Sequence, residues 1–380
     1  MTKKFMETEG RLPLLTIVVP VYNGKDYVRD TVKSILKTDY PQIELLLVDD
    51  GSTDESPIIC KGLMEADGRI RYIRQENSGI AAARNKGLNM AAGEYICFCD
   101  QDDFVEPFMY SKVLGHMIKE AAPMGMCSTG RLIDGKKSGY EFLQDGCYRQ
   151  EEILEHILYP LLFRGYCYPF IQNGNYLYGT IWKCIYNRKF LQQHNMSFKR
   201  FVSFEDDWLF VTETLAYVDI IVTNSDIGYY WHINAASESH SKKYIPDITK
   251  RFEKLDQYVM HYLAPRIKEK EIIEEYKKIA LCGHYEEGYR NVACAGTKQE
   301  RRACKKALVQ YLLDSDYKVQ LDSLRHLKRN VFRRRFLYGS LKYLGIRVTF
   351  FINRLLLLLE KSGNKIQWLV ALERKAKRKG

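Results

Sequence analysis

Three aspartates stand where an apolar run ends. Residues 95–99, Tyr-Ile-Cys-Phe-Cys, have the composition of a buried strand, and Asp100, Asp102 and Asp103 follow directly. Carboxylates this close repel one another, and a divalent cation between them removes the conflict. Asp-x-Asp spacing offers hard oxygen ligands to Mg2+ or Mn2+, ions that usually keep room for substrate phosphates. The pattern therefore predicts a site for a metal and a diphosphate.

Two more polar groups occur earlier in the chain. Asp49 and Asp50 directly follow the apolar residues 43–48, and Arg84 lies in the Ala-rich stretch 79–92. In open α/β sheets, ligands bind at the carboxyl ends of the parallel strands. We therefore expect Asp49 and Asp50 to lie with the aspartates of residues 100–103 at one edge of a sheet, and Arg84 belongs to an element that lies between these two acidic groups in the sequence.

The first hundred residues alternate between strand and helix patterns. We expect strands at 14–20, 43–48, 69–74 and 95–99, and helices at 26–38, 52–64 and 79–92. Ser52 or Thr53 is the expected N-cap of the second helix. This order predicts an α/β fold in which helices flank a doubly wound, mostly parallel sheet.

The pattern is looser beyond residue 103. We expect helices at 104–120, 182–193 and 206–217, strands at 220–222 and 227–231, and a charged helical stretch at 247–325. Residues 121–180 mix glycines, aromatic residues and short apolar runs and predict no particular element. Three parts are expected: a sheet domain at 1–240, a C-terminal helical domain at 241–330 and a basic helical segment at 331–380.

Four motifs follow one another in a fixed order. They are Pro20-Val21-Tyr22-Asn23, Val48 to Asp54, Asn77-Ser78-Gly79 with Ala83 to Gly87, and Asp100 to Asp103. Together they resemble the family 2 glycosyltransferases of the GT-A fold, a Rossmann-like α/β fold. The resemblance covers residues 14–110 closely, extends to about residue 235 and is absent beyond. One such motif alone is unspecific, whereas four in this order are specific.

The resemblance implies an enzyme that uses a nucleotide-sugar donor, with a UDP-sugar expected. Asp50 would accept a hydrogen bond from uracil, Asp100 would lie near the ribose, and Asp102 would bind the Mn2+ or Mg2+ that bridges the diphosphate. Such a metal stabilises charge on the leaving diphosphate. The other nucleotide-binding residues that the resemblance implies are Pro20, Tyr22, Asn23 and Arg84.

Sugar transfer also needs a base for the acceptor hydroxyl. Residues 204–208, Phe-Glu-Asp-Asp-Trp, resemble the Glu-Asp motif that opens a helix in the family. We assign the base to Asp206, with Glu205 beside it, and keep Asp207 as the alternative. The resemblance implies a single displacement with inversion at the anomeric carbon. The Gln-x-x-Arg-Trp signature of processive synthases is missing, which favours transfer of one sugar per event.

His232 lies where the sequence departs from the family. After Tyr-Tyr-Trp at 229–231, relatives often have Arg or Lys and then Gly-Ser, whereas this chain continues His-Ile-Asn-Ala. His232 is a candidate ligand of the metal or contact of the diphosphate, and the alternative is a histidine with a purely structural role.

The basic charge is concentrated at the C-terminal end. Residues 331–380 hold thirteen Lys/Arg and two Asp/Glu, a surplus of 11 that equals the +11 of the whole chain. Apolar residues from Leu337 to Leu359 recur at helical spacing, which is typical of a helix that lies in a membrane interface, although such a face can also pack on protein. We expect this segment to bind an anionic membrane surface.

The expected location is the cytoplasm, at the inner face of the cell membrane. The ten cysteines show no paired spacing, and residues 1–13 lack the apolar core of a signal peptide. Acceptors at such a surface would be cell-envelope glycans, polysaccharides or lipid-linked sugars. Whether the chain forms a homo-oligomer is left open.

Three rival functions make different demands on the sequence. A catalytically silent sugar-binding or scaffold module predicts disrupted acidic motifs, whereas these motifs are intact. A nucleotidyltransferase typically has a Gly-rich, basic loop near the first strand, and residues 19–24 offer none. A nucleic-acid-binding protein predicts basic residues across its folded part, whereas residues 1–330 are neutral by formal charge.

Overall fold

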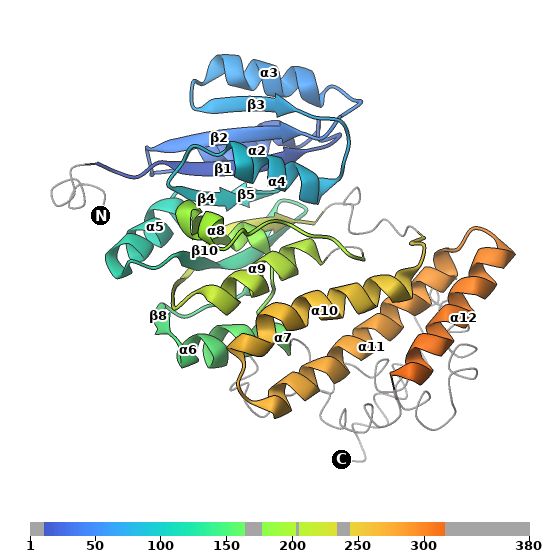
Figure 1. Ribbon diagram of the computed structural model, residues 1–380. Coiled ribbons are helices and arrows are strands. Elements are labelled where there is room, and N and C mark those ends of the chain that lie inside the picture. The colour runs from blue at the N-terminus through green and yellow to red at the C-terminus, as the bar shows by residue number, and fades with distance from the viewer. Residues whose placement is uncertain (1–10, 164–176, 203–204, 234–243, 316–380) are drawn as a thin grey trace, which may run out of the picture. The chain divides into compact units, whose positions relative to one another are not determined.

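The computed structural model describes residues 11–163, 177–202, 205–233 and 244–315 (Figure 1). Contacts divide these residues into a sheet unit, which runs to residue 233 and includes Tyr258–Arg266, and a helical unit made of residues 244–257 and 267–315. Helix α10 (Ile248–Arg266) contributes to both units. The three-part division expected from the sequence stays a prediction, and its last part, 331–380, lies outside the described residues.

The sheet unit is built on one mixed sheet. Its strand order is β3-β2-β1-β4-β9-β6-β10-β5, with β7 beside β6 and β8 beside β10. The strands are β1 (Leu15–Val21), β2 (Ile43–Asp49), β3 (Ile70–Arg74), β4 (Tyr95–Phe98), β5 (Phe104–Val105), β6 (Met124–Ile133), β7 (Lys136–Glu141), β8 (Gly146–Arg149), β9 (Cys184–Asn187) and β10 (Ile220–His232).

The first four strands form the parallel half of the sheet. Strand β1 pairs in parallel with both β2 and β4, and β2 pairs in parallel with β3. Every residue of β1 and β2 is buried, as expected for continuous apolar runs in a sheet covered on both faces. The α/β fold with a mostly parallel, helix-flanked sheet is thereby confirmed.

Helices cover this sheet (Figure 1). Those of the sheet unit are α2 (Val28–Leu36), α3 (Ser56–Ala66), α4 (Ile80–Met90), α5 (Met109–Glu120), α6 (Glu151–Ile153), a π-helical turn (Leu154–Leu158), α7 (Tyr159–Leu162), a 3-10 turn (Ile181–Lys183), α8 (Arg188–Gln193) and α9 (Asp206–Tyr217). Helix α4 packs on β1 and β2, and α5 packs on β6 and β10.

Helix α3 begins later than the sequence indicated. The predicted caps Ser52 and Thr53 lie in a loop that side chains hold in place. Ser52 donates its backbone N–H to Asp49 (2.8 Å) and accepts the backbone N–H of Asn23 (3.0 Å). Asp54 then accepts the backbone N–H of Ser56, the first residue of α3, at 2.9 Å. These hydrogen bonds satisfy the backbone without a helix.

The expectation of one helix over 182–193 is wrong. Residues 184–187 form β9, which lies antiparallel between β4 and β6, and α8 starts only after Asn187. The Asn187 side chain caps α8 by accepting the backbone N–H of Phe190 at 3.1 Å. A short apolar run can form either a strand or a helix. Here, hydrogen bonding to β4 on one side and to β6 on the other favours the strand.

Two other segments also differ from expectation. The stretch 104–120 starts with the short strand β5 before α5, and the two strands expected at 220–222 and 227–231 are one strand, β10, with irregular register at 224–229. Residues 124–149, which predicted no element, form β6, β7 and β8.

The helical unit contains the first part of α10 together with α11 (Lys270–Cys294) and α12 (Lys298–Asp314). Its packing centres on His284, whose ring stacks on Phe252 at 4.3 Å and whose Nδ1 lies 2.8 Å from the hydroxyl of Tyr311. Burial lowers the pKa of His284 to about 3. The imidazole therefore acts as a neutral core group in this unit.

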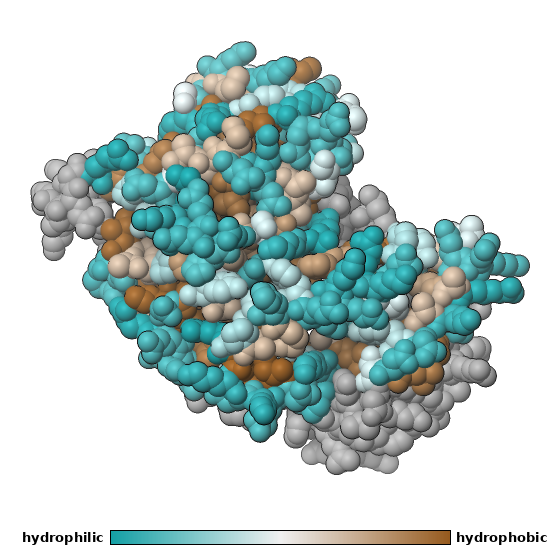
Figure 2. All heavy atoms as spheres, in the orientation of Figure 1, coloured by the Kyte–Doolittle hydropathy of each residue, from teal (hydrophilic) through white to brown (hydrophobic). Residues whose placement is uncertain are grey.

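The surface of the described part is mainly hydrophilic on the face drawn in Figure 2, with scattered hydrophobic residues. Within the described ranges, no helix combines the length and the apolar character that crossing a membrane requires.

Replacing Gly87 with alanine tests how closely α4 approaches the sheet. A Cβ at this position would lie 2.3 Å from Val18 of β1, so we expect Gly87→Ala to lower the free energy of unfolding by about 1–3 kcal/mol. Gly62 in α3 is a matched control because a Cβ there meets no atom within 4 Å, and alanine should stabilise that helix slightly. Urea unfolding of both variants measures the difference, and equal midpoints would contradict the packing described.

Candidate active site

The carboxyl ends of β1, β2 and β4 lie at one edge of the sheet, and side chains from the three loops join them. Tyr22, directly after β1, exchanges two hydrogen bonds with the side chain of Gln101, each 3.0 Å long, through its backbone N–H and C=O. Asn23 adopts a left-handed conformation (φ +48°) and accepts the backbone N–H of Thr53 at 2.8 Å. The loops after β1, β2 and β4 are therefore tied together before any ligand binds.

Asp50 organises the loop that leads into α4. Its carboxylate accepts the side-chain N–H of Gln75 (2.8 Å) and the backbone N–H groups of Ser78 (2.9 Å) and Gly79 (2.7 Å). Gly79 has a φ of +87°, which favours glycine there. A carboxylate has about four lone-pair positions, so three bonds leave Asp50 with one acceptor position for a ligand.

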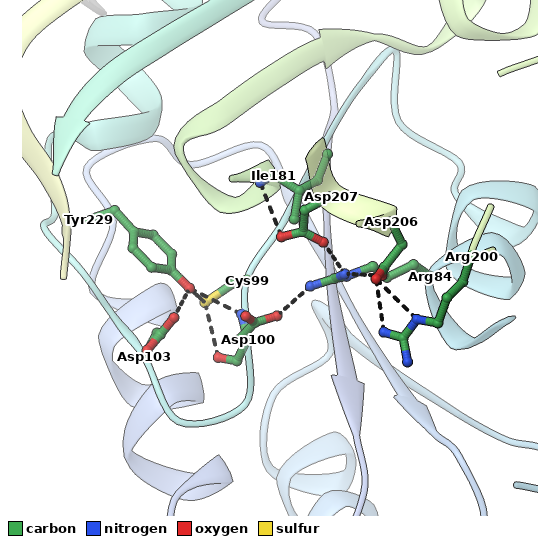
Figure 3. A network of polar contacts seen from close by, with 9 residues as sticks. All are labelled: Arg84, Cys99, Asp100, Asp103, Ile181, Arg200, Asp206, Asp207 and Tyr229. Carbon is green, nitrogen blue, oxygen red and sulfur yellow. Dashed lines mark hydrogen bonds and ion pairs between the residues drawn. The ribbon is translucent and has the colours of Figure 1, made fainter. Parts of the chain in front are cut away.

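Arg84, on α4, is the centre of the polar network in Figure 3. Its guanidinium donates to Asp100 at 2.9 Å and to Asp206 at 3.0 Å, and it also pairs with Asp207. The Arg84 side chain is only 3% exposed. Burial alone would lower the pKa of this guanidinium, but the three carboxylates outweigh burial and raise it. Arg84 thus joins the end of β4 to the start of α9.

Asp206 and Asp207 are adjacent in sequence but have different surroundings. The carboxylate of Asp206 is buried between two guanidinium groups, because Arg200 donates twice to the oxygen that Arg84 leaves, at 2.8 and 3.1 Å. Asp207 is half-buried and accepts the backbone N–H of Ile181 at 3.4 Å in addition to its pair with Arg84. Asp206 therefore accepts hydrogen bonds from two guanidinium groups, Arg84 and Arg200, whereas Asp207 accepts from one guanidinium, that of Arg84.

The pKa of Asp207 is unusual for an aspartate. Burial raises it to about 7, and the negative charges of Asp206 and Asp100 add to the increase while Arg84 opposes it. A carboxylate of this basicity is suited to accept a proton near neutral pH.

Glu205 precedes α9 and is engaged with the backbone before it. Its carboxylate accepts the backbone N–H groups of Phe201 and Val202. These bonds shape the turn that presents Asp206 and Asp207.

The acidic loop after β4 is anchored by its last residue. Asp103 is completely buried and accepts the hydroxyl of Tyr229 (2.6 Å) and the backbone N–H of His232 (2.8 Å). Burial and the charges of Asp100 and Asp102 raise the pKa of Asp103. Asp103 therefore orients the loop, and Asp102 beside it is half-buried.

Asp102 and His232 are the side chains beside this loop whose chemistry could serve a cation. In the described ranges, no group of three or more His, Cys, Asp or Glu side chains is arranged to hold a metal by itself. Mg2+ sites commonly use one or two carboxylates plus substrate phosphates, so a site of few protein ligands is the form expected here. Among the described residues, the buried Nδ1 of His232 has no hydrogen-bond partner, and its ring contacts Tyr27 and Phe104 edge-on.

The structure brings together most of the residues that the sequence singled out. Direct contacts join Arg84, Asp100 and Asp206. The hydrogen bonds described above hold the loops at the same edge of the sheet, and these loops carry Tyr22, Asn23, Asp50 and Asp102. Pro20 is buried within β1. Sequence reasoning assigned no role to Gln101, Arg200 or Tyr229. Gln101 lies inside a recognised motif and could have been found, whereas Arg200 and Tyr229 act through contacts that no local pattern encodes.

Comparison with known proteins agrees with this geometry. The family model described as glycosyl transferase family 2 matches residues 16–153. The Streptococcus pneumoniae glycosyltransferase GlyA is 51% identical over 92 residues, which are 24% of this chain and 13% of GlyA. The Bacillus subtilis protein EpsH is 31% identical over 188 residues, which are 49% of this chain and 50% of EpsH. The chain thus spans about half, or less, of the length of these relatives.

A solved structure resembles the fold over a longer range. Staphylococcus aureus TarS 1–349 in complex with UDP-GlcNAc superposes with a TM-score of 0.63, covers 92% of each chain and shares 16% sequence identity. At that identity the likeness shows the fold, and it agrees with the sheet topology described above. The resemblance inferred from the four motifs is confirmed where they lie: residues 16–153 match the family 2 glycosyltransferase model, and the fold is GT-A-like.

Proposed function

We propose that this protein transfers one sugar from a UDP-sugar to a hydroxyl of an acceptor, with inversion and with the help of Mn2+ or Mg2+. The observation that carries the proposal is the Arg84 network, which holds Asp100, on the donor side, against Asp206 and Asp207, where a base is needed. The family match and the UDP-GlcNAc bound by the TarS neighbour support a UDP-sugar as donor.

On the donor side, each residue has a role that its contacts permit. Asp50 would accept the uracil N–H with its remaining lone pair, while Pro20, Tyr22 and Asn23 would line the base pocket. Tyr22 suits contact with a flat base because its side chain lies at the surface, 47% exposed. Asp100, steadied by Arg84, would lie near the ribose.

Asp102 would hold the divalent cation, with His232 as a second candidate ligand. When bound, the cation stabilises the negative charge that develops on the leaving diphosphate. Asp103 supports this arrangement because it fixes both the acidic loop and the backbone of His232.

On the acceptor side, we now favour Asp207 over Asp206 as the base. The acceptor oxygen attacks the anomeric carbon, the bond from that carbon to the diphosphate oxygen breaks, and the hydroxyl proton passes to the carboxylate of Asp207. Asp206 would position Asp207 through Arg84, since both oxygens of Asp206 are already engaged by guanidinium groups. Glu205, which the sequence placed beside the base, would shape the turn.

The expected acceptors are cell-envelope glycans, polysaccharides or lipid-linked sugars at the inner face of the membrane. The support is the charge of residues 331–380, whose surplus of 11 positive charges suits an anionic surface.

Nucleotide-sugar binding can be tested by thermal unfolding. We expect at least one UDP-sugar to raise the Tm, and Mn2+ to enlarge the increase, because a ligand at about 100 times its Kd stabilises a protein by about 2.7 kcal/mol. Asp102→Asn should lose the part of the increase that depends on Mn2+. Asp226→Asn is the matched control, since Asp226 is exposed and forms a surface ion pair with Lys112. A wild-type Tm that no nucleotide sugar changes would contradict the proposal.

The base assignment predicts a particular dependence of rate on pH. Below about pH 7, the raised pKa keeps Asp207 protonated, so kcat should fall about tenfold per pH unit and level off above pH 7. Asp207→Asn should lower kcat by roughly a hundredfold or more while the chain stays folded.

Asp206→Asn provides the comparison for Asp207→Asn. Its main effect should be a lower free energy of unfolding, because it removes a buried anion from between two guanidinium groups. If Asp207→Asn keeps the wild-type kcat, the base lies elsewhere.

Membrane attachment by residues 331–380 can be tested with vesicles. We expect the full chain to sediment with phosphatidylglycerol vesicles but not with phosphatidylcholine vesicles, and to dissociate at high salt. Replacing the five Lys/Arg of residues 374–379 with glutamine should weaken binding, since each basic residue near an anionic surface contributes about 1 kcal/mol. Equal binding to both kinds of vesicle would rule out the electrostatic account.

A further inference from the structure

Arg131 of the sheet unit is a cationic side chain whose neighbours are aromatic rings. The guanidinium carbon of Arg131, on β6, lies 3.6 Å from the ring centre of Tyr140 and 5.8 Å from that of Trp231. Tyr140 in turn lies 4.5 Å from Tyr178, centre to centre. We refer to Arg131, Tyr140, Tyr178 and Trp231 as the Arg131 platform.

Among the residues that the structure describes, no carboxylate balances the charge of Arg131. Within the described ranges, Arg131 forms no ion pair, and its buried Nε has no hydrogen-bond partner. Other arginines of this unit, such as Arg84 and Arg200, do pair with carboxylates, and what sets Arg131 apart is this lack of an ion pair, since the buried Nε of Arg84 also has no hydrogen-bond partner. The aromatic rings offer cation–π attraction but no acceptor for the N–H groups. A half-buried guanidinium in this state is suited to bind an anion, which supplies both charge and hydrogen-bond acceptors.

The platform shares a face of the sheet with Tyr229, which contacts the acidic loop. Arg131 is the register partner of Trp231, and Thr129 is the partner of Tyr229, so all four side chains belong to one face of β6 and β10. Tyr229 donates its hydroxyl to Asp103, and Trp231 lies two residues further on, about 7 Å along the strand.

The segment 178–183 connects the platform to Asp207. Its first residue, Tyr178, donates its backbone N–H to Glu141 at 3.0 Å, and Ile181 donates its own to Asp207. Trp182 stacks on Tyr229 with the ring centres 4.4 Å apart. A completely buried ion pair between Lys183 and Glu141 fixes this segment against β7. Residues 178–183 thus link the platform to Asp207 through direct contacts.

We propose that the acceptor is an anionic glycan or polyol, which carries a phosphate or carboxylate near the hydroxyl that receives the sugar. Arg131 binds the anionic group, and the rings of Tyr140 and Trp231 pack against the C–H groups of the acceptor. This inference rests on the proposed function, since it identifies the acceptor for the base at Asp207.

The test is binding of three probes to the full chain, measured by calorimetry with UDP and Mn2+ present. The probes are a poly(glycerol phosphate) oligomer, an oligogalacturonate and the neutral maltotetraose. We expect one anionic probe to bind more tightly than maltotetraose, and its identity shows whether phosphate or carboxylate is recognised. Arg131→Gln should weaken that binding about tenfold or more, because it removes charge-assisted hydrogen bonds.

Two further variants keep the result interpretable. Arg131→Lys retains the charge and should recover part of the affinity, and Arg149→Gln removes an arginine that pairs with Glu120 at the surface and should change nothing. Equal binding of the three probes, no binding of any, or an unchanged affinity in Arg131→Gln would overturn the inference. Hydrolysis of UDP-sugars, measured in parallel, tests the proposed function separately, since it needs no acceptor.

Discussion

The candidate site depends on one buried cation. Arg84 donates to carboxylates that come from two distant parts of the chain, the loop after β4 and the first turn of α9. A guanidinium with five donors in a rigid fork can hold several carboxylates at once, which a lysine cannot do in the same geometry. Without this cation, Asp100, Asp206 and Asp207 would repel one another in a poorly solvated place. Arg84 therefore ties the first turn of α9 to the loop after β4, in addition to the packing of Phe210 of α9 against Phe98 of β4 and Tyr186 of β9.

The two sides of the site are built in different ways. On the proposed donor side, the contacts join motifs that the sequence itself marks, although these motifs lie 28 to 79 residues apart: Asp50 accepts hydrogen bonds from the loop before α4, and Gln101 bonds to the backbone of Tyr22. On the proposed acceptor side, the surrounding residues come from β6, β7, β10 and residues 178–183, which no motif marks. The proposed donor side is therefore visible in sequence motifs, whereas the proposed acceptor side depends on how the second half of the sheet is assembled.

This difference explains what the sequence could and could not predict. The parallel strands β1 to β4 and the acids that follow β2 and β4 were predictable because continuous apolar runs ending in polar motifs are local signals. Strand β9 was mistaken for part of a helix because its four residues suit either state until their neighbours are known. The different surroundings of Asp206 and Asp207 were equally inaccessible, since the contacts with Arg200 and with the backbone of Ile181 exist only in the folded chain.

The central claim is that base recognition, metal–diphosphate binding and proton acceptance lie along one line held by Arg84. A crystal structure of the chain with UDP and Mn2+ bound tests it most directly. The account predicts uracil at Asp50, the ribose at Asp100, the metal and diphosphate at Asp102, and Asp207 facing the open space beyond the terminal phosphate. UDP bound at another edge of the sheet, or a metal that Asp102 does not touch, would contradict it.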